Sequence, residues 1–138
     1  RYTMEVNLTG DFLTVKHAGQ AMARGGGGSI VAISSIAGVL THRFMTPYCT
    51  AKAGLEMLVR CAADELGQAG IRVNAVAPGL VETPMTANWP DMLETWKARS
   101  PMKRPAKPED IADLVAALVA NQYVTGEVVI ADGGLNLT

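Results

Sequence analysis

Residues 71–79 read IRVNAVAPG, a short apolar run, rich in β-branched residues, that stops at a Pro-Gly pair. A run of this length bounded by turn residues is typical of a buried strand. Towards the N-terminus lie a helical pattern over residues 47–66, which begins at Pro47, and a second apolar run, Ser29–Ser34 (SIVAIS). Strand, helix and strand therefore follow one another along the chain.

The same alternation continues on both sides of this unit. Helical patterns cover residues 2–24 and 108–120, and a third apolar run, EVVIA, covers residues 127–131. Residues 80–107 are irregular, with a short helix expected near 91–99. Because each strand is a continuous apolar run, we expect an α/β fold, a doubly wound parallel sheet of about three strands with helices on both faces. The four glycines 25–28 follow a helix and precede a strand, so they are a connection and not a phosphate-binding turn.

Composition limits the range of functions. The chain has 138 residues, which suits one modest domain, and its net charge of −1 gives no attraction to nucleic acid or anionic membranes. No apolar run reaches the roughly 18 to 20 residues that span a bilayer. Cys49 and Cys61 lie too far apart on one predicted helix for a disulfide, which favours a reducing, cytoplasmic compartment. No set of side chains has metal-ligand spacing, so we expect no metal site.

Polar residues gather where the first two predicted strands end. Ser35 follows the first strand, Pro78-Gly79 ends the second, and Tyr48 opens the helix that starts at the same edge of the sheet. Tyr48 and Lys52 are four residues apart and share a helix face. Since a cation within about 4 to 6 Å favours a phenolate, Lys52 would prepare Tyr48 for general acid/base work.

Further motifs accompany this pair in a fixed order along nearly the whole chain. They are Ser34-Ser35, Tyr48–Gly54 (YCTAKAG), Ile71–Asn74 (IRVN), Pro78–Thr83 (PGLVET), Pro108–Ala112 (PEDIA), Tyr123–Gly126 (YVTG) and Asp132–Gly134 (DGG). Together they resemble the classical short-chain dehydrogenase/reductase family, whose fold is Rossmann-like.

The resemblance implies a catalytic tetrad. Tyr48 would be the general acid/base, and Lys52 would tune it and hydrogen-bond the nicotinamide ribose. Ser35 would hold the substrate oxygen, with Ser34 as the competing candidate one residue short of the family spacing. Asn7 resembles the helix asparagine that orders a water in the proton relay.

The resemblance also implies a cofactor site. Pro78, Gly79 and Val81 match the turn beside the nicotinamide, where the Val81 backbone would meet the carboxamide, and Thr83 matches a threonine that contacts the carboxamide or pyrophosphate. The cofactor would be NAD or NADP, with the choice unreadable from these residues. The motifs match the C-terminal half of the family pattern, so we expect a partial domain that lacks the N-terminal nucleotide-binding half.

The implied function is an NAD(P)-dependent oxidoreductase that interconverts a secondary alcohol and a ketone, as a homotetramer. Residues 85–107 correspond to the mobile lid over the substrate. Both tryptophans lie there with Met92 and Leu93, which suggests a small-molecule substrate with an apolar body. Two alternatives stay open: a 3-oxoacyl-(acyl-carrier-protein) reductase of fatty-acid synthesis, and a non-catalytic oligomerising fragment.

Overall fold

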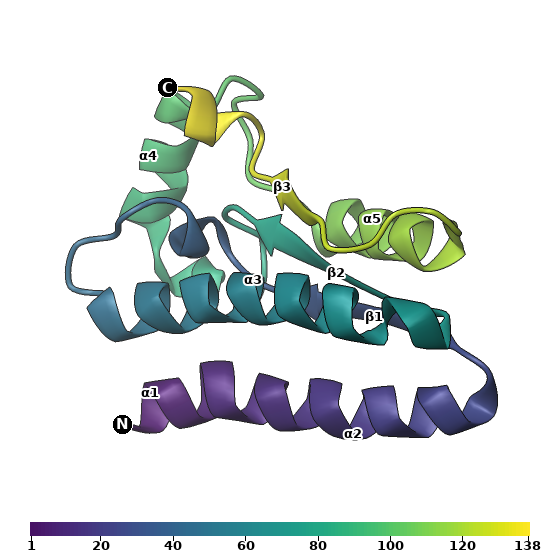
Figure 1. Cartoon of the computed structure of the whole chain (residues 1–138). Helices are drawn as coiled ribbons and strands as arrows, with labels where there is room; N and C mark the ends of the chain where they lie inside the picture. The colour runs from purple at the N-terminus through teal and green to yellow at the C-terminus, as the bar shows by residue number, and fades with distance from the viewer.

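The computed structural model describes all residues, 1–138, as an alternation of helices and strands (Figure 1). Its elements are α1 (Tyr2–Met4), a π-helical turn (Glu5–Thr9), α2 (Gly10–Gly25), β1 (Gly28–Ile33), α3 (Thr46–Leu66), β2 (Ile71–Pro78), α4 (Pro90–Arg99), α5 (Pro108–Ala120) and β3 (Val128–Ala131), with short 3-10 turns between them.

The three strands form one parallel sheet in the order β1-β2-β3. Ile30 of β1 lies opposite Val73 of β2, and Val76 of β2 lies opposite Val129 of β3. The central strand β2 is buried almost throughout, as its apolar sequence predicts. The predicted α/β class and the parallel sheet are confirmed.

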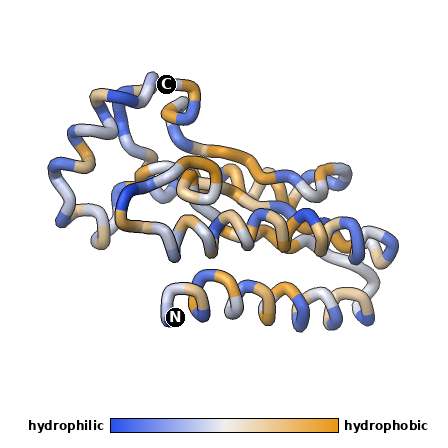
Figure 2. The backbone as a smooth tube through the Cα atoms, turned by 60° about the vertical axis from the view of Figure 1, so that its left-hand side comes forward, coloured by the Kyte–Doolittle hydropathy of each residue, from blue (hydrophilic) through white to orange (hydrophobic).

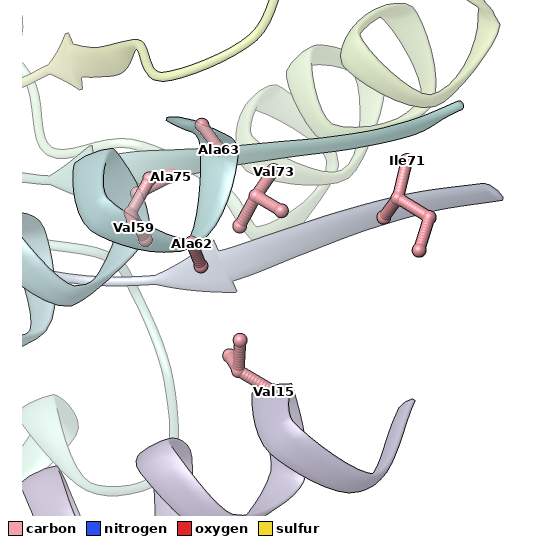
Figure 3. Packing of buried hydrophobic residues seen from close by; sticks show 7 residues of the cluster. All are labelled: Val15, Val59, Ala62, Ala63, Ile71, Val73 and Ala75. Atoms are coloured by element: carbon pink, nitrogen blue, oxygen red, sulfur yellow. The ribbon is translucent and has the colours of Figure 1, made fainter. Parts of the chain in front are cut away.

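Helices cover both faces of this sheet. On one face, Val15 of α2 and Val59 of α3 pack with Ile71 and Val73 in the main core, and Figure 3 shows Val15 pointing from α2 towards the strands. On the other face, the guanidinium of Arg72 donates to two backbone carbonyls at the end of α5, at 2.9 Å each. Figure 2 shows the hydrophobic residues concentrated along the strands and the helix sides that face them.

The predicted boundaries differ from the structure by one or two residues, apart from one local feature. The first helix is interrupted at Glu5–Thr9, where the backbone N–H of Gly10 bonds the carbonyl of Glu5, five residues back. Helical periodicity predicts a continuous helix there, because residues 4, 8, 12 and 15 recur at ordinary α-helical spacing and give no signal for the turn. None of the helices is long and apolar enough to cross a membrane.

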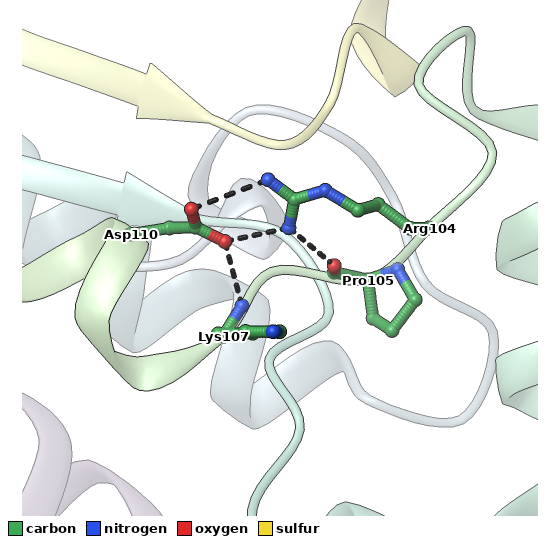
Figure 4. A network of polar contacts seen from close by, with 4 residues as sticks. All are labelled: Arg104, Pro105, Lys107 and Asp110. Atoms are coloured by element: carbon green, nitrogen blue, oxygen red, sulfur yellow. Dashed lines mark hydrogen bonds and ion pairs between the residues drawn. The ribbon is translucent and has the colours of Figure 1, made fainter.

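Residues 83–105 form an excursion whose two ends meet. The backbone N–H of Glu82 donates to Ala106, and the N–H of Ala106 donates to Leu80, both at 2.8 Å. Near the second end, Arg104 pairs with Asp110 through two hydrogen bonds, which Figure 4 shows beside the N–H of Lys107. The Arg104 guanidinium and the Lys107 N–H lower the pKa of the Asp110 carboxyl to about 2. These contacts fix the base of the predicted lid.

The middle of this excursion is held by Trp96. This side chain of α4 is only 8% exposed and packs with Ile36, Leu80 and Leu135 in a second, smaller core. Leu93 packs against the same cluster. Two of the apolar lid residues therefore secure the lid to the sheet.

Candidate functional site

The ends of β1 and β2 and the start of α3 meet at one edge of the sheet. Lys52 makes the connection, since its Nζ donates to the carbonyl oxygen of Ile33, the last residue of β1, at 2.9 Å. β1 is in turn paired with β2 as far as Val76, two residues before Pro78. The predicted side chains therefore belong to segments that are directly bonded or adjacent.

The two neighbouring serines have different environments. Ser34 is buried, and its hydroxyl donates to Glu56 Oε1 at 2.9 Å. Ser35 is half-buried and caps a 3-10 turn, where its Oγ accepts the N–H of Ala37 at 3.2 Å. Because Ser35 uses only an acceptor lone pair, its own proton stays available for a substrate oxygen. Of the two serines, Ser35 is the more exposed at this edge.

Tyr48 and Lys52 lie on one face of α3, as their spacing predicts. The Lys52 Nζ is 5.8 Å from the centroid of the Tyr48 ring. Burial lowers the pKa of the Lys52 ammonium, and the carboxylate of Asp11 opposes that shift. The tyrosine is half-buried, and its hydroxyl makes no hydrogen bond within the chain. The arrangement places a cation beside a phenol that is free to react.

Asn7 lies inside the π-helical turn, which packs against α3. Its Nδ2 donates to the carbonyl of Thr3 at 3.1 Å, and no hydrogen bond joins it to Ser35, Tyr48 or Lys52. A π turn alters the pattern of backbone partners and is frequent at functional sites. The structure thus puts Asn7 next to the catalytic helix without a direct contact to the other three residues.

The turn after β2 is shaped by close packing. A Cβ at Gly79 would overlap Cζ2 of Trp96 and lie 2.9 Å from Cα of Asp132, so only glycine fits. Beyond it, the carbonyl of Val81 accepts from Thr86 Oγ1 at 2.6 Å, whereas the Val81 N–H has no partner within the chain. An unused backbone donor at this edge is suited to a polar ligand group.

Thr83 and Thr86 bind one another. The N–H of Thr83 donates to Thr86 Oγ1 at 2.8 Å, and the two hydroxyl oxygens are 3.3 Å apart. This contact orders the first turn of the lid. Both threonines also line a depression bordered by Glu82, Pro84, Ala87 and Leu93.

Two carboxylates beside the site, Glu56 and Asp11, were not predicted from the sequence. Glu56 is buried one turn after Lys52, where it accepts the Ser34 hydroxyl, and the absence of a side chain at Gly38 leaves room for it. Asp11 lies on α2, and its carboxylate opposes the lowering of the Lys52 pKa by burial. The signal for Asp11 was present, because it interrupts an apolar stripe of the first helix at residues 8, 15 and 22.

Comparison with known proteins identifies the family. The family model described as enoyl-(acyl carrier protein) reductase matches residues 1–136. The cis-4-hydroxycyclohexanecarboxylate dehydrogenase of Sinomonas cyclohexanicum is 42% identical over 97% of the chain. A short-chain type dehydrogenase/reductase structure from Mycobacterium ulcerans superposes with a TM-score of 0.95, at 38% identity over 99% of the chain. The chain belongs to the short-chain dehydrogenase/reductase family.

A third similar protein is ElxO, whose structure with NADP bound superposes with a TM-score of 0.88 at 30% identity over 96% of the chain. The chain covers 55% of the Sinomonas enzyme, 52% of the Mycobacterium chain and 56% of ElxO. It thus spans about half the length of these short-chain dehydrogenase/reductase relatives. The Rossmann-like fold class and the family resemblance predicted from the motifs are confirmed.

Proposed function

We propose that this chain is the catalytic part of an NAD(P)-dependent oxidoreductase that interconverts a secondary alcohol and a ketone. The observation that carries the proposal is the Tyr48–Lys52 pair with Ser35, on segments joined by the Lys52–Ile33 hydrogen bond. The relatives support the same chemistry, since the Sinomonas protein is a dehydrogenase of a cyclic hydroxy acid by name.

The proton steps follow from the side chains. In the reducing direction, the Tyr48 hydroxyl gives its proton to the carbonyl oxygen of the substrate, and the Lys52 cation stabilises the phenolate that remains. The Ser35 hydroxyl donates to the same oxygen and favours the charge that develops on it. In the oxidising direction, the phenolate takes the proton of the alcohol. Asn7 and the π turn would order the water that returns protons to solvent.

The residues at this edge fit a nicotinamide nucleotide. The Val81 N–H is free, the Gly79 turn lets a ring approach the backbone, and the Lys52 ammonium can share its donors between Ile33 and a ribose hydroxyl. When bound, the nicotinamide supplies or accepts the hydride at the carbinol carbon. Pro78 and Thr83 complete the proposed contacts, and ElxO, of the same fold, has been solved with NADP.

The substrate would carry an apolar body. Trp96 and Leu93 are occupied by the lid's own packing, but Met85 and Trp89 are 70% and 42% exposed, and Phe44 is exposed in the loop before α3. These exposed apolar side chains support a substrate with an apolar body. A homotetramer and a cytoplasmic location also belong to the proposal, on the family resemblance alone.

A carrier-bound 3-oxoacyl thioester is the second candidate substrate. The description of the matching family model names an acyl carrier protein, and an acyl chain would suit the same exposed apolar residues. This alternative changes the substrate and leaves the roles of Tyr48, Lys52 and Ser35 as they are.

The test is the Tyr48→Phe variant of the full chain, assayed on secondary alcohols with NAD and with NADP. We expect turnover to fall at least about 10²-fold with unchanged nucleotide affinity, because only the proton donor is lost. Tyr123→Phe, at a fully exposed position, is the matched control and should keep its activity. Undiminished turnover in Tyr48→Phe would exclude the assignment.

A further inference from the structure

Asp11 occupies an interior position of the first helix. The side of the π turn and α2 that faces α3 and the sheet carries Leu8, Asp11, Val15, Gly19 and Met22, at spacings of three and four residues. Leu8 contacts α3 at Gly54, Val15 lies in the main core, and Met22 packs beside Gly28. Asp11 is the one charged residue of this side and is half-buried.

The Asp11 carboxylate has no direct partner within the chain. It accepts no hydrogen bond, and no cation lies within 4.0 Å of its oxygens. A half-buried carboxylate without a direct partner is stabilised by a cation within about 4 to 6 Å. The neighbouring turns of the first helix offer no cation on this side, where Asn7 and Val15 lie, so a balancing cation must come from β1 or α3.

The register of α2 against β1 indicates which group lies close enough to balance the Asp11 carboxylate. The two segments run antiparallel, joined by the turn at Gly26–Gly27, and Met22 lies beside Gly28 (Figure 1). From Gly28 to Ile33 a strand advances about 16 Å. Eleven helical residues span about the same length, which places Asp11 at the level of Ile33. The carbonyl of Ile33 is the acceptor of Lys52 Nζ.

We propose that Asp11 is a positioning residue for the reaction proposed above: its carboxylate balances the buried charge of Lys52 and keeps that side chain a cation beside Tyr48. The inference rests on the proposed function for its catalytic meaning. The electrostatic coupling between Asp11 and Lys52 can be measured without any turnover.

Other ionisable groups also lie on the elements around Lys52. On α3, Glu56 accepts the Ser34 hydroxyl, and Tyr48 is the group that Lys52 acts on. In the π turn, Glu5 is exposed and pairs with Arg1 at 2.8 Å. The loop before α3 contributes His42 and Arg43, and the residues at the end of β1 are not ionisable. Among the carboxylates of the chain, Asp11 is the one that opposes the lowering of the Lys52 pKa by burial.

The experiment is a pH titration of the lysine side chains by NMR in the full chain with 13C-labelled lysine. The chain has five lysines, and Lys52→Arg assigns the signal of interest. Two neutral variants, Asp11→Asn and Asp11→Ser, remove the carboxylate with different side-chain volumes, Asp11→Glu retains the charge, and Glu5→Gln is the matched control on the same helix.

We expect the titration midpoint of Lys52 to move to lower pH in both neutral variants, because the ammonium loses the anion that opposes its burial. Asp11→Glu should restore most of the shift, and Glu5→Gln should leave the midpoint unchanged. An unchanged Lys52 midpoint in both neutral variants would overturn the proposal.

A pH profile of kcat/KM separates this proposal from the proposed function. If both proposals hold, the alkaline limb of the kcat/KM profile moves to lower pH in Asp11→Asn, because the Lys52 ammonium loses its proton at a lower pH. A moved Lys52 midpoint in a protein without dehydrogenase activity would support the coupling and refute the reaction. An active enzyme in which neither the midpoint nor the alkaline limb responds to Asp11→Asn would refute the role of Asp11 alone.

Discussion

A single methyl group at Gly79 should disrupt the packing between the lid and the sheet. In Gly79→Ala the new Cβ would overlap Cζ2 of Trp96 and lie 2.7 Å from its Cη2 and 2.9 Å from Cα of Asp132. Carbon atoms pack at about 3.5 to 4.0 Å, so each of these distances is repulsive. The ring cannot swing out without losing its place among Ile36, Leu80 and Leu135.

The expected cost lies at the upper end for an overpacked core, about 3 kcal/mol, because one of the opposing atoms belongs to the backbone. For the 138 residues of this chain, with an unfolding entropy of about 2.1 cal/mol/K per residue, that cost lowers the melting temperature by roughly 10 °C. Urea unfolding followed by circular dichroism measures the loss. Tryptophan fluorescence reports at the same time whether the buried Trp96 has moved.

Gly67→Ala is the matched control. Gly67 has a helical φ of −57°, and a Cβ there would meet no atom within 4 Å. Alanine should therefore be neutral or stabilise by up to about 1 kcal/mol. If Gly79→Ala unfolds at the same urea concentration as the parent protein and keeps its fluorescence, the packing of Trp96 on the turn is wrong.

Two further predictions concern side chains with assigned partners. Ser34→Ala should destabilise the protein by about 1 to 3 kcal/mol, because the buried Glu56 loses its hydrogen-bond donor. Ser35→Ala should lower turnover about 10²-fold and change the stability by about 1 kcal/mol or less. Urea unfolding and steady-state kinetics on both variants test this contrast, and equal effects of the two substitutions on stability and turnover would contradict it. The Arg104 contact holds the pKa of Asp110 at about 2, below its ordinary 3.8, so the stability it provides is complete above pH 4 and is lost as the pH falls through 2. Asp110→Asn should therefore lose less stability than the parent protein as the pH falls from 4 to 2, which thermal unfolding at several pH values measures. An identical pH dependence of the melting temperature in both proteins would contradict the Arg104–Asp110 pair.

The sequence predicts most of the fold because its signals are local. The apolar runs 29–34, 71–77 and 127–131 lie within one residue of the observed strands at each end. Pro47 and Pro108 lie at the starts of α3 and α5, as the helix-start preference of proline predicts.

The parts that the sequence does not reveal depend on contacts between distant residues. The different environments of Ser34 and Ser35 follow from the hydrogen bond of Ser34 to Glu56, 22 residues further on. The burial of Trp96 follows from the space above Gly79, which helical periodicity in the lid does not encode. The Tyr48–Lys52 pair is different, because an i, i+4 spacing on a helix fixes it locally.

The central claim is that the residues at this edge of the sheet serve hydride transfer between a substrate carbon and a nicotinamide. The most direct measurement uses secondary alcohols and 3-hydroxyacyl thioesters deuterated at the carbinol carbon, incubated with the full chain and oxidised NAD or NADP. Mass spectrometry of the reduced nucleotide then locates the label. We expect deuterium in the nucleotide with the parent protein and at least about 10²-fold slower labelling with Tyr48→Phe. Ketone formation without deuterium in the nucleotide would contradict it.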